Sequence, residues 1–261
     1  MRLSRWLAVV LAVFVGVALL SSPEAADAAK KSHDKKHHKK SAKSTAKPKR
    51  ERSEEPAKKK KFRGVCRLQR AKTFLERDHF VRHGQLQPLR HQKALKWRIE
   101  HYGRIPGVPF EKLNPTSAFS HAKQVRFMGL PIQIHEDIAP ALACVEKRIK
   151  KTCNKKGRKY VPRAIGGFRQ ANTYRGGEVS NHLFGIAVDI DPNRNPCCGC
   201  VDPWPTHPAC KKDTKRVIEK AELTQCWVDA FERYGFYWLG KDSLQDTMHF
   251  EFLGDPDRII P

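Results

Sequence analysis

The chain has 261 residues, enough for one sizeable domain or two small ones with a hydrophobic core. Its content of 39% hydrophobic and 30% charged residues excludes a membrane-embedded protein and a fully disordered one. The net charge of +24 favours polyanionic partners, whether nucleic acid, anionic lipid or anionic cell-wall polymer.

Residues 1–28 are predicted to be a secretory signal peptide. Arg2 and Arg5 precede an apolar run over 7–20, which is too short for a comfortable membrane span. The tripeptide at 26–28, Ala-Asp-Ala, matches an A-x-A cleavage site. An uncleaved membrane anchor is the alternative interpretation. We therefore expect an exported protein, in the periplasm or in the extracellular space and cell wall, where nucleic acid is not an expected partner.

Residues 29–63 are predicted to be a disordered, Lys-rich tether. The stretch 30–63 holds 16 basic and 4 acidic residues, a net charge of +12, with no apolar periodicity. Such a segment has almost nothing to bury, so we expect it to attract anionic cell-envelope polymers through its charge.

Eight cysteines lie beyond the predicted signal peptide: Cys66, Cys144, Cys153, Cys197, Cys198, Cys200, Cys210 and Cys226. Their even number and the export signal predict disulfides, whose connectivity the sequence does not determine. One pair is excluded, because a helix from Cys144 to Cys153 would separate them by about 13 Å. A structural zinc site within 197–210 is the alternative, and this insertion is expected to form a wall or lid of a cleft.

Residues 64–118 are predicted to form a helical segment that packs on the rest of the chain. Leu95, Ile99 and Tyr102 recur on one helical face, and glycines and prolines then interrupt the pattern. The segment shows no recognisable chemistry.

Residues 119–261 predict an α+β fold, a small antiparallel sheet with flanking helices. A strand is expected over 125–128 and a turn over 129–131, and helices are expected over about 137–152 and 224–234. Few elements alternate as strand, helix and strand, which favours antiparallel pairing. The side chains expected to be buried by the two helices are Ile138, Leu142, Val145, Ile149, Trp227 and Phe231.

The first motif lies at 180–191, Ser-Asn-His-Leu-Phe-Gly-Ile-Ala-Val-Asp-Ile-Asp. A strand over 185–190 would turn its β-branched residues into the core and leave glycine, alanine and Asp189 on the other face. His182 lies on the approach to this open face, and an imidazole meeting a carboxylate there suits zinc. The alternative is a core strand with an incidental histidine. Asp191 is expected in a turn, although it could reach the same site.

The second motif favours the metal site over that alternative. A strand over 246–252 would direct Met248, Phe250 and Phe252 to the core and place His249 and Glu251 on the opposite face. His249 would be a third ligand, and three protein ligands with an open fourth position are typical of catalytic zinc. A nearby acid could then take a proton from water.

The two motifs, S-x-H-x-x-G-x-A-x-D and D-x-M-H-F-E, resemble those of the D-alanyl-D-alanine carboxypeptidase family of zinc peptidases, over about 125–254. That group includes vancomycin-resistance dipeptidases and carboxypeptidases and phage L-alanyl-D-glutamate endolysins, and it shares the fold of the hedgehog zinc domain. The resemblance implies His182, Asp189 and His249 as zinc ligands and Asp246 as general base and acid. Glu251 is then expected behind a ligand.

Further site residues follow from the same resemblance. Gly-Phe-Arg at 167–169 resembles the family's G-[YF]-R, which implies that Arg169 binds substrate and stabilises negative charge. The interval to His182 is short for the family, so Arg175 is a possible substitute. Ser180 is expected to donate a hydrogen bond to substrate or loop, and Trp238 either lines the cleft or belongs to the core.

The sequence thus predicts a secreted zinc metallopeptidase that hydrolyses peptidoglycan stem peptides, as a D-Ala-D-Ala carboxypeptidase or a related endopeptidase. The alternative is a zinc-containing cell-wall binding protein of the same fold without catalysis. A third class, an exported nucleic-acid binder, lacks interleaved aromatic residues in its basic tract.

Overall fold

The computed structural model describes residues 66–153, 160–174, 176–201 and 203–259, all within a compact unit that spans Lys58–Pro261. The signal and tether predictions, Arg175 among the site residues, and residues 154–159 lie outside the described residues. The α-helices of the described part are α1 (Arg77–Phe80), α2 (Pro88–Tyr102), α3 (Ala139–Thr152) and α4 (Gln225–Glu232). Its strands are β1 (Val81–Arg82), β2 (Gln85–Leu86), β3 (Ala122–Phe127), β4 (Leu130–His135), β5 (Ile165–Gly166), β6 (Ala187–Ile190), β7 (Phe236–Trp238) and β8 (His249–Phe252). None of the helices in the described ranges is long and apolar enough to span a bilayer.

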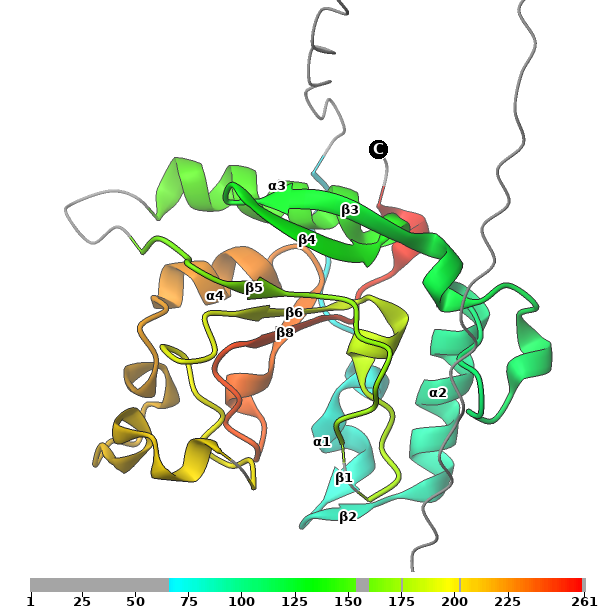
Figure 1. Cartoon of the computed structure of the whole chain (residues 1–261), viewed down its shortest axis with the longest axis horizontal. Coiled ribbons are helices and arrows are strands. Elements are labelled where there is room, and N and C mark those ends of the chain that lie inside the picture. Colours follow the sequence, from blue (N-terminus) through cyan, green and yellow to red (C-terminus); the bar gives the residue numbers. More distant parts are fainter. Residues whose placement is uncertain (1–65, 154–159, 175, 202, 260–261) are drawn as a thin grey trace, which may run out of the picture. The chain divides into compact units, whose positions relative to one another are not determined.

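A four-stranded antiparallel sheet lies at the centre of the unit, in the order β5-β6-β8-β7. Figure 1 labels its strands β5, β6 and β8. Its register places Asp189 of β6 opposite His249 of β8, and Glu251 of β8 opposite both Ala187 and Tyr237. Residues directly opposite in an antiparallel pair share a face, so these side chains lie on one side of the sheet. The predicted α+β fold with a small antiparallel sheet is confirmed.

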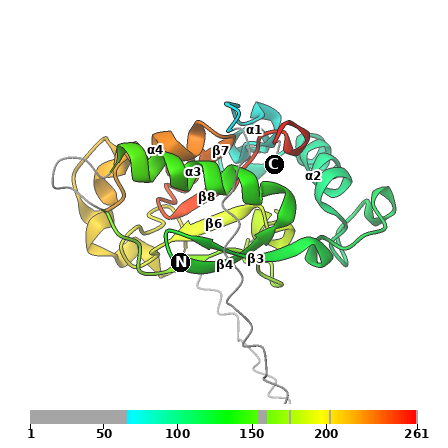
Figure 2. The ribbon, with the colours of Figure 1, turned by 90° about the horizontal axis from the view of Figure 1, so that it is seen from above.

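The opposite face of the sheet is apolar and packs against helices. Val188, Phe250 and Phe252 are fully buried in the core, and α3 and α4 lie side by side over it (Figure 2). All of the side chains that the sequence predicted to be buried by the two helices are buried. They lie in α3 and α4, except Ile138, which directly precedes α3. The helix predicted from residue 137 begins at Ala139, because Glu136–Ile138 forms a 3-10 turn.

The helical segment before residue 118 contributes to the same core. Leu95, Ile99 and Tyr102 of α2 are buried in the cluster that also holds the sheet and α3. This segment also contains the short β1–β2 hairpin, which the helical interpretation did not include. It therefore shares its hydrophobic core with the sheet that carries both motifs.

The strand and turn predicted at 125–131 form the β3–β4 hairpin. The strand begins earlier, at Ala122, and the turn is the pair Met128-Gly129, with φ of 51° and 92°. Two left-handed residues are typical of the tight hairpin turn that matches strand twist. Leu130 and Pro131, which the prediction placed in the turn, already pair in β4.

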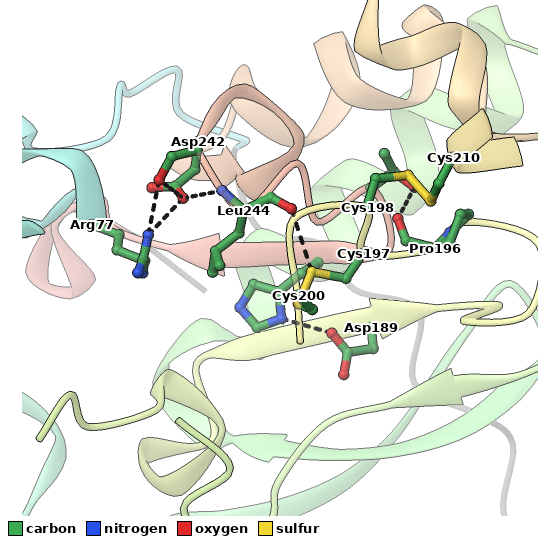
Figure 3. The surroundings of a disulfide bond; sticks show 12 residues. Arg77, Asp189, Pro196, Cys197, Cys198, Cys200, Cys210, Asp242 and Leu244 are labelled. Atoms are coloured by element: carbon green, nitrogen blue, oxygen red, sulfur yellow. Dashed lines mark hydrogen bonds and ion pairs between the residues drawn. A yellow bond between two sulfur atoms is a disulfide. The ribbon is translucent and has the colours of Figure 1, made fainter. Parts of the chain in front are cut away.

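All eight cysteines are paired, as Cys66–Cys144, Cys153–Cys226, Cys197–Cys200 and Cys198–Cys210. The exclusion of a Cys144–Cys153 pair is confirmed. The zinc alternative for 197–210 is wrong in this structure, because its four sulfur atoms are bonded to one another in pairs (Figure 3). Disulfides persist mainly in oxidising compartments, so this pairing is consistent with a protein outside the cytoplasm.

Candidate metal centre

Three side chains meet on the open face of the sheet. The Asp189 carboxylate lies 2.7 Å from His249 Nδ1 through one oxygen and 3.1 Å from His182 Nε2 through the other. The two ring nitrogens are 3.2 Å apart, and all three residues are buried. The sequence prediction that His182, Asp189 and His249 come together therefore agrees with the geometry, which forms a group capable of holding a metal.

The approach of His182 depends on a sharp turn after it. His182 lies in a 3-10 turn, Asn181–Phe184, which ends at Gly185 with φ 68°. A Cβ at Gly185 would lie 2.4 Å from the Phe168 ring and 2.8 Å from the His135 nitrogen, so only glycine fits. The glycine thus allows the chain to turn sharply from His182 toward β6.

The outer nitrogen of each histidine is held by an acceptor. His182 Nδ1 contacts the Gly167 carbonyl, and His249 Nε2 lies 3.0 Å from Glu251 Oε1. A nitrogen that donates outward leaves the other ring nitrogen with a lone pair, which is the arrangement found behind metal-ligating histidines. In their neutral forms, the two imidazoles therefore present a lone pair on each inner nitrogen to the space they share with the Asp189 carboxylate.

The electrostatics of this group call for a positive charge. Burial lowers the pKa of His182, which keeps that imidazole neutral. Burial also opposes protonation of His249, but the Asp189 and Glu251 carboxylates outweigh it and raise the pKa of His249 well above its ordinary value. The carboxylates that favour a proton on His249 equally favour a metal cation in place of that proton, and two imidazoles with one carboxylate suit a transition metal such as zinc.

Asp246 lies beside the metal group, outside the regular strand. The predicted strand over 246–252 begins only at His249. Asp246 instead forms an antiparallel bridge with Cys197, which lies far earlier in the chain. Burial, together with the nearby Asp189 and Glu251 carboxylates, raises the pKa of Asp246 to about 7. Its Oδ1 atom is buried without a hydrogen-bond partner among the described residues. The side chain is thus a carboxyl group able to exchange a proton near neutral pH.

Arg169 reaches the group from its exposed side. Its Nη2 atom lies 3.4 Å from Asp189 Oδ2, and its backbone N–H donates to the His182 carbonyl. The side chain is 40% exposed, so it borders the solvent. The preceding Gly167 supplies the carbonyl behind His182, and a Cβ there would lie 2.2 Å from the Gln133 carbonyl oxygen. The Gly-Phe-Arg segment therefore both supports a candidate ligand and places a cation at the site.

The remaining predicted residues lie behind the site or away from it. The Ser180 hydroxyl is buried and accepts from the His182 N–H at 3.3 Å, so it caps the turn that carries the imidazole. Trp238 is buried opposite Phe250 on the core face and donates its indole N–H to the Thr247 carbonyl, which matches the core alternative. Asp191 does not reach the metal group, because its carboxylate accepts from Tyr160, Arg163 and Ala164.

Sequence reasoning missed Arg98, a buried cation near the site. Arg98 of α2 is 1% exposed and donates to the Leu75 carbonyl at 2.8 Å. Burial raises the pKa of Glu251, but its hydrogen bond with His249 and the charges of His249 and Arg98 outweigh burial. The net effect is a lowered pKa, so Glu251 remains ionised behind the imidazole. The available signal was a charged residue within the apolar stripe of Leu95, Ile99 and Tyr102.

An ion-pair network connects the loop before Ser180 to the N-terminal helices. Arg77 of α1 donates to both oxygens of Glu178, at 2.7 and 2.9 Å, and to Asp242 at 2.8 Å. These residues are buried, so the network fixes the loop at 172–180 and the loop at 239–246 against the same helix. The three residues lie in no motif that the sequence analysis identified.

Comparison with known proteins identifies one family. Residues 173–252 match the family model described as D-alanyl-D-alanine carboxypeptidase. The match includes His182, Asp189, Asp246 and His249, whereas Arg169 lies outside it, and it is shorter than the 125–254 over which the motifs resemble the family. No curated protein and no solved structure matches the chain. The chain therefore contains a domain of this peptidase family over residues 173–252.

Proposed function

We propose, from the premise that residues 173–252 form a D-alanyl-D-alanine carboxypeptidase family domain, that this protein is a secreted zinc metallopeptidase. Its substrates are peptide bonds of peptidoglycan stem peptides, cleaved as a D-Ala-D-Ala carboxypeptidase or a related endopeptidase. The observation that carries the proposal is the convergence of two imidazole nitrogens and a carboxylate, each imidazole held from behind by an acceptor. Beside them, Asp246 Oδ1 has no hydrogen-bond partner within the described ranges.

The cofactor of the proposal is Zn2+, held by His182, Asp189 and His249. Three ligands of this type leave a coordination position open, which distinguishes catalytic zinc sites from structural ones. The ion would supply Lewis-acid chemistry, activating water and polarising the scissile carbonyl.

The chain's own residues then move the proton and stabilise the charge. Asp246 accepts the proton of the attacking water and returns it to the departing amine, a role that its pKa of about 7 suits. Arg169 is partly exposed next to Asp189 and stabilises the negative charge that develops on the carbonyl oxygen. Glu251 and Ser180 hold the two histidines in place.

Localisation and wall binding complete the proposal. The signal-like residues 1–28 would direct export, which the four disulfides favour. The tether at 29–63 would attract anionic cell-envelope polymers through its charge, an interaction that salt weakens.

The decisive experiment is digestion of defined muropeptides by the purified protein, followed by mass spectrometry of the products. Release of a terminal D-alanine would identify a carboxypeptidase, and internal cleavage of the stem would identify an endopeptidase. Intact muropeptides at full metal content would contradict the proposal and favour the non-catalytic wall-binding alternative.

A further inference from the structure

The turn that holds the Cys197–Cys200 disulfide is attached along its length to the loop that carries Asp246. Cys197 and Asp246 pair as an antiparallel bridge. The other backbone hydrogen bonds between the turn and the loop run from Cys198 to Gln245, from Gly199 to Leu244 and from Thr247 to Pro196. These contacts hold the disulfide against the loop that carries Asp246, in a corner formed by the turn and the loop. Figure 3 shows this disulfide together with Asp189 of the metal centre.

The side chains of this corner form a second group with metal-ligand chemistry. The sulfur atoms of Cys197 and Cys200 and a carboxylate oxygen of Asp246 all lie within 4.8 Å of one another. In the disulfide, neither sulfur is a thiolate, so the group cannot bind a metal in this oxidation state. Asp246 Oδ1 is buried in the corner without a partner among the described residues.

One contact suits the reduced state better than the oxidised state. The Leu244 carbonyl oxygen lies 3.5 Å from Cys197 Sγ. Figure 3 marks this contact with a dashed line. A disulfide sulfur has no proton to donate to this acceptor, whereas a thiol does. The corner is therefore already shaped to accept a Cys197 thiol.

We propose that reduction of the Cys197–Cys200 disulfide creates a second zinc site, formed by the thiolates of Cys197 and Cys200 and the carboxylate of Asp246. Two thiolates make the site soft, which selects zinc over magnesium or calcium. Zinc–sulfur bonds of about 2.3 Å in a tetrahedral arrangement place the sulfurs roughly 3.8 Å apart. The sulfurs therefore need to separate by only about 2 Å from their bonded positions, and the half-buried Cys200, next to exposed Gly199, can provide that movement.

The reduction step needs a dithiol donor of the thioredoxin-like class. A donor thiolate attacks the sulfur of Cys200, which is half-buried, and Cys197, which is 1% exposed, leaves as the thiolate. The second donor thiol then releases Cys200, so the donor becomes a disulfide and the protein gains two electrons and two protons. Binding of zinc releases both thiol protons.

The consequence for activity rests on the proposed function. If Asp246 is the general base, its carboxylate cannot accept a proton while it binds the second ion. Reduction in the presence of zinc would then stop the enzyme, and reoxidation would restore it. The metal site itself does not depend on this role.

The test measures zinc per chain in the full protein before and after reduction. A phosphine reductant is used, because dithiols themselves chelate zinc. After equilibration with zinc and removal of the excess, we expect about one zinc per chain in the oxidised protein and about two in the reduced protein. The double variant C197S/C200S should stay at one zinc under both conditions, whereas C198S/C210S, which removes the neighbouring disulfide, should still gain the second. A reduced protein that stays at one zinc, or a C197S/C200S protein that gains a second, would overturn the proposal.

Cobalt(II) gives a second readout that identifies the ligands. Thiolate-to-cobalt absorption in the near ultraviolet should develop on reduction of the wild type and of C198S/C210S, and it should be absent from C197S/C200S. When the wild type binds the second zinc, its peptidase activity should fall at least tenfold. If the protein proves to have no peptidase activity, the zinc and cobalt measurements still decide the second site, so failure of the proposed function and failure of this inference are distinguishable.

Discussion

The metal ligands and the proton-transfer residue are positioned by two different kinds of structure. Asp189 and His249 sit opposite each other on paired strands, where backbone hydrogen bonds determine which side chains meet. Asp246 lies only three residues before His249, yet it belongs to a loop that a disulfide-linked turn holds in place. The comparison teaches that the two functions can be disturbed separately, because strand register fixes one and a crosslinked turn fixes the other.

The largest expected effect is loss of the metal. His249→Ala removes a ligand from the sheet, so we expect the purified protein to lose most of its zinc and essentially all activity, as measured by elemental analysis and muropeptide digestion. His207→Ala is the matched control, because His207 lies in the cysteine-rich insertion and contacts the Asn193 carbonyl. Zinc at full stoichiometry in His249→Ala would refute the ligand assignment.

The next effect separates proton transfer from metal binding. Asp246→Asn keeps the shape of the side chain but removes its basicity, so turnover should fall by roughly 10²–10⁴-fold while zinc content is unchanged. Glu251→Gln, compared at matched zinc content, tests the other acid. A large loss of turnover in Glu251→Gln with a small one in Asp246→Asn would transfer the role to Glu251.

The pH profile should report the same carboxyl group. The base must be ionised, so kcat/KM of the wild type should fall as pH decreases through the pKa of Asp246. Burial raises this pKa to about 7, whereas the positive charge of bound zinc lowers it. The acidic limb of the pH profile should therefore lie at or below about pH 7. The residual activity of Asp246→Asn should lack this limb, and an identical limb in the variant would assign the titration elsewhere.

A smaller effect is expected from the residue behind His249. Glu251→Gln weakens the acceptor of the His249 Nε2 proton, and loss of such a partner reduces metal affinity by about 10–100-fold. Competition with a chelator of known affinity measures this change. An unchanged zinc affinity would show that Glu251 does not orient the imidazole.

The smallest effect concerns the tether. Deletion of 30–63 removes a net charge of +12 and no predicted core residue, so turnover on soluble muropeptides should stay nearly unchanged. Binding to isolated sacculi should weaken, and the difference should shrink as salt shortens the Debye length. A difference that does not depend on salt would argue against an electrostatic tether.

The sequence predicted the parts of the site that depend on strand alternation. Period-two alternation places Asp189 and His249 on the open faces of two strands, and the family resemblance implied that both residues bind the same zinc ion. It did not predict that Asp246 leaves the strand, because that depends on contacts with residues 196–200, about fifty positions earlier. Arg98 was missed for a related reason. Its place in the apolar stripe of α2 was visible in the sequence, but the packing of α2 that brings its charge near Glu251 was not.

The strand pairing and the disulfides also determine how much of the chain would have to be transplanted to move this site to another protein. The family match spans only 173–252. The Gly167 carbonyl behind His182, the edge strand β5 and the helix α3 that covers the core all precede it. Cys226 would lose its partner Cys153, which lies outside the matched stretch. A fragment cut at the borders of the match would therefore expose an apolar sheet face and a free thiol. The smallest portable module is the compact unit that the structure describes from Cys66 onward.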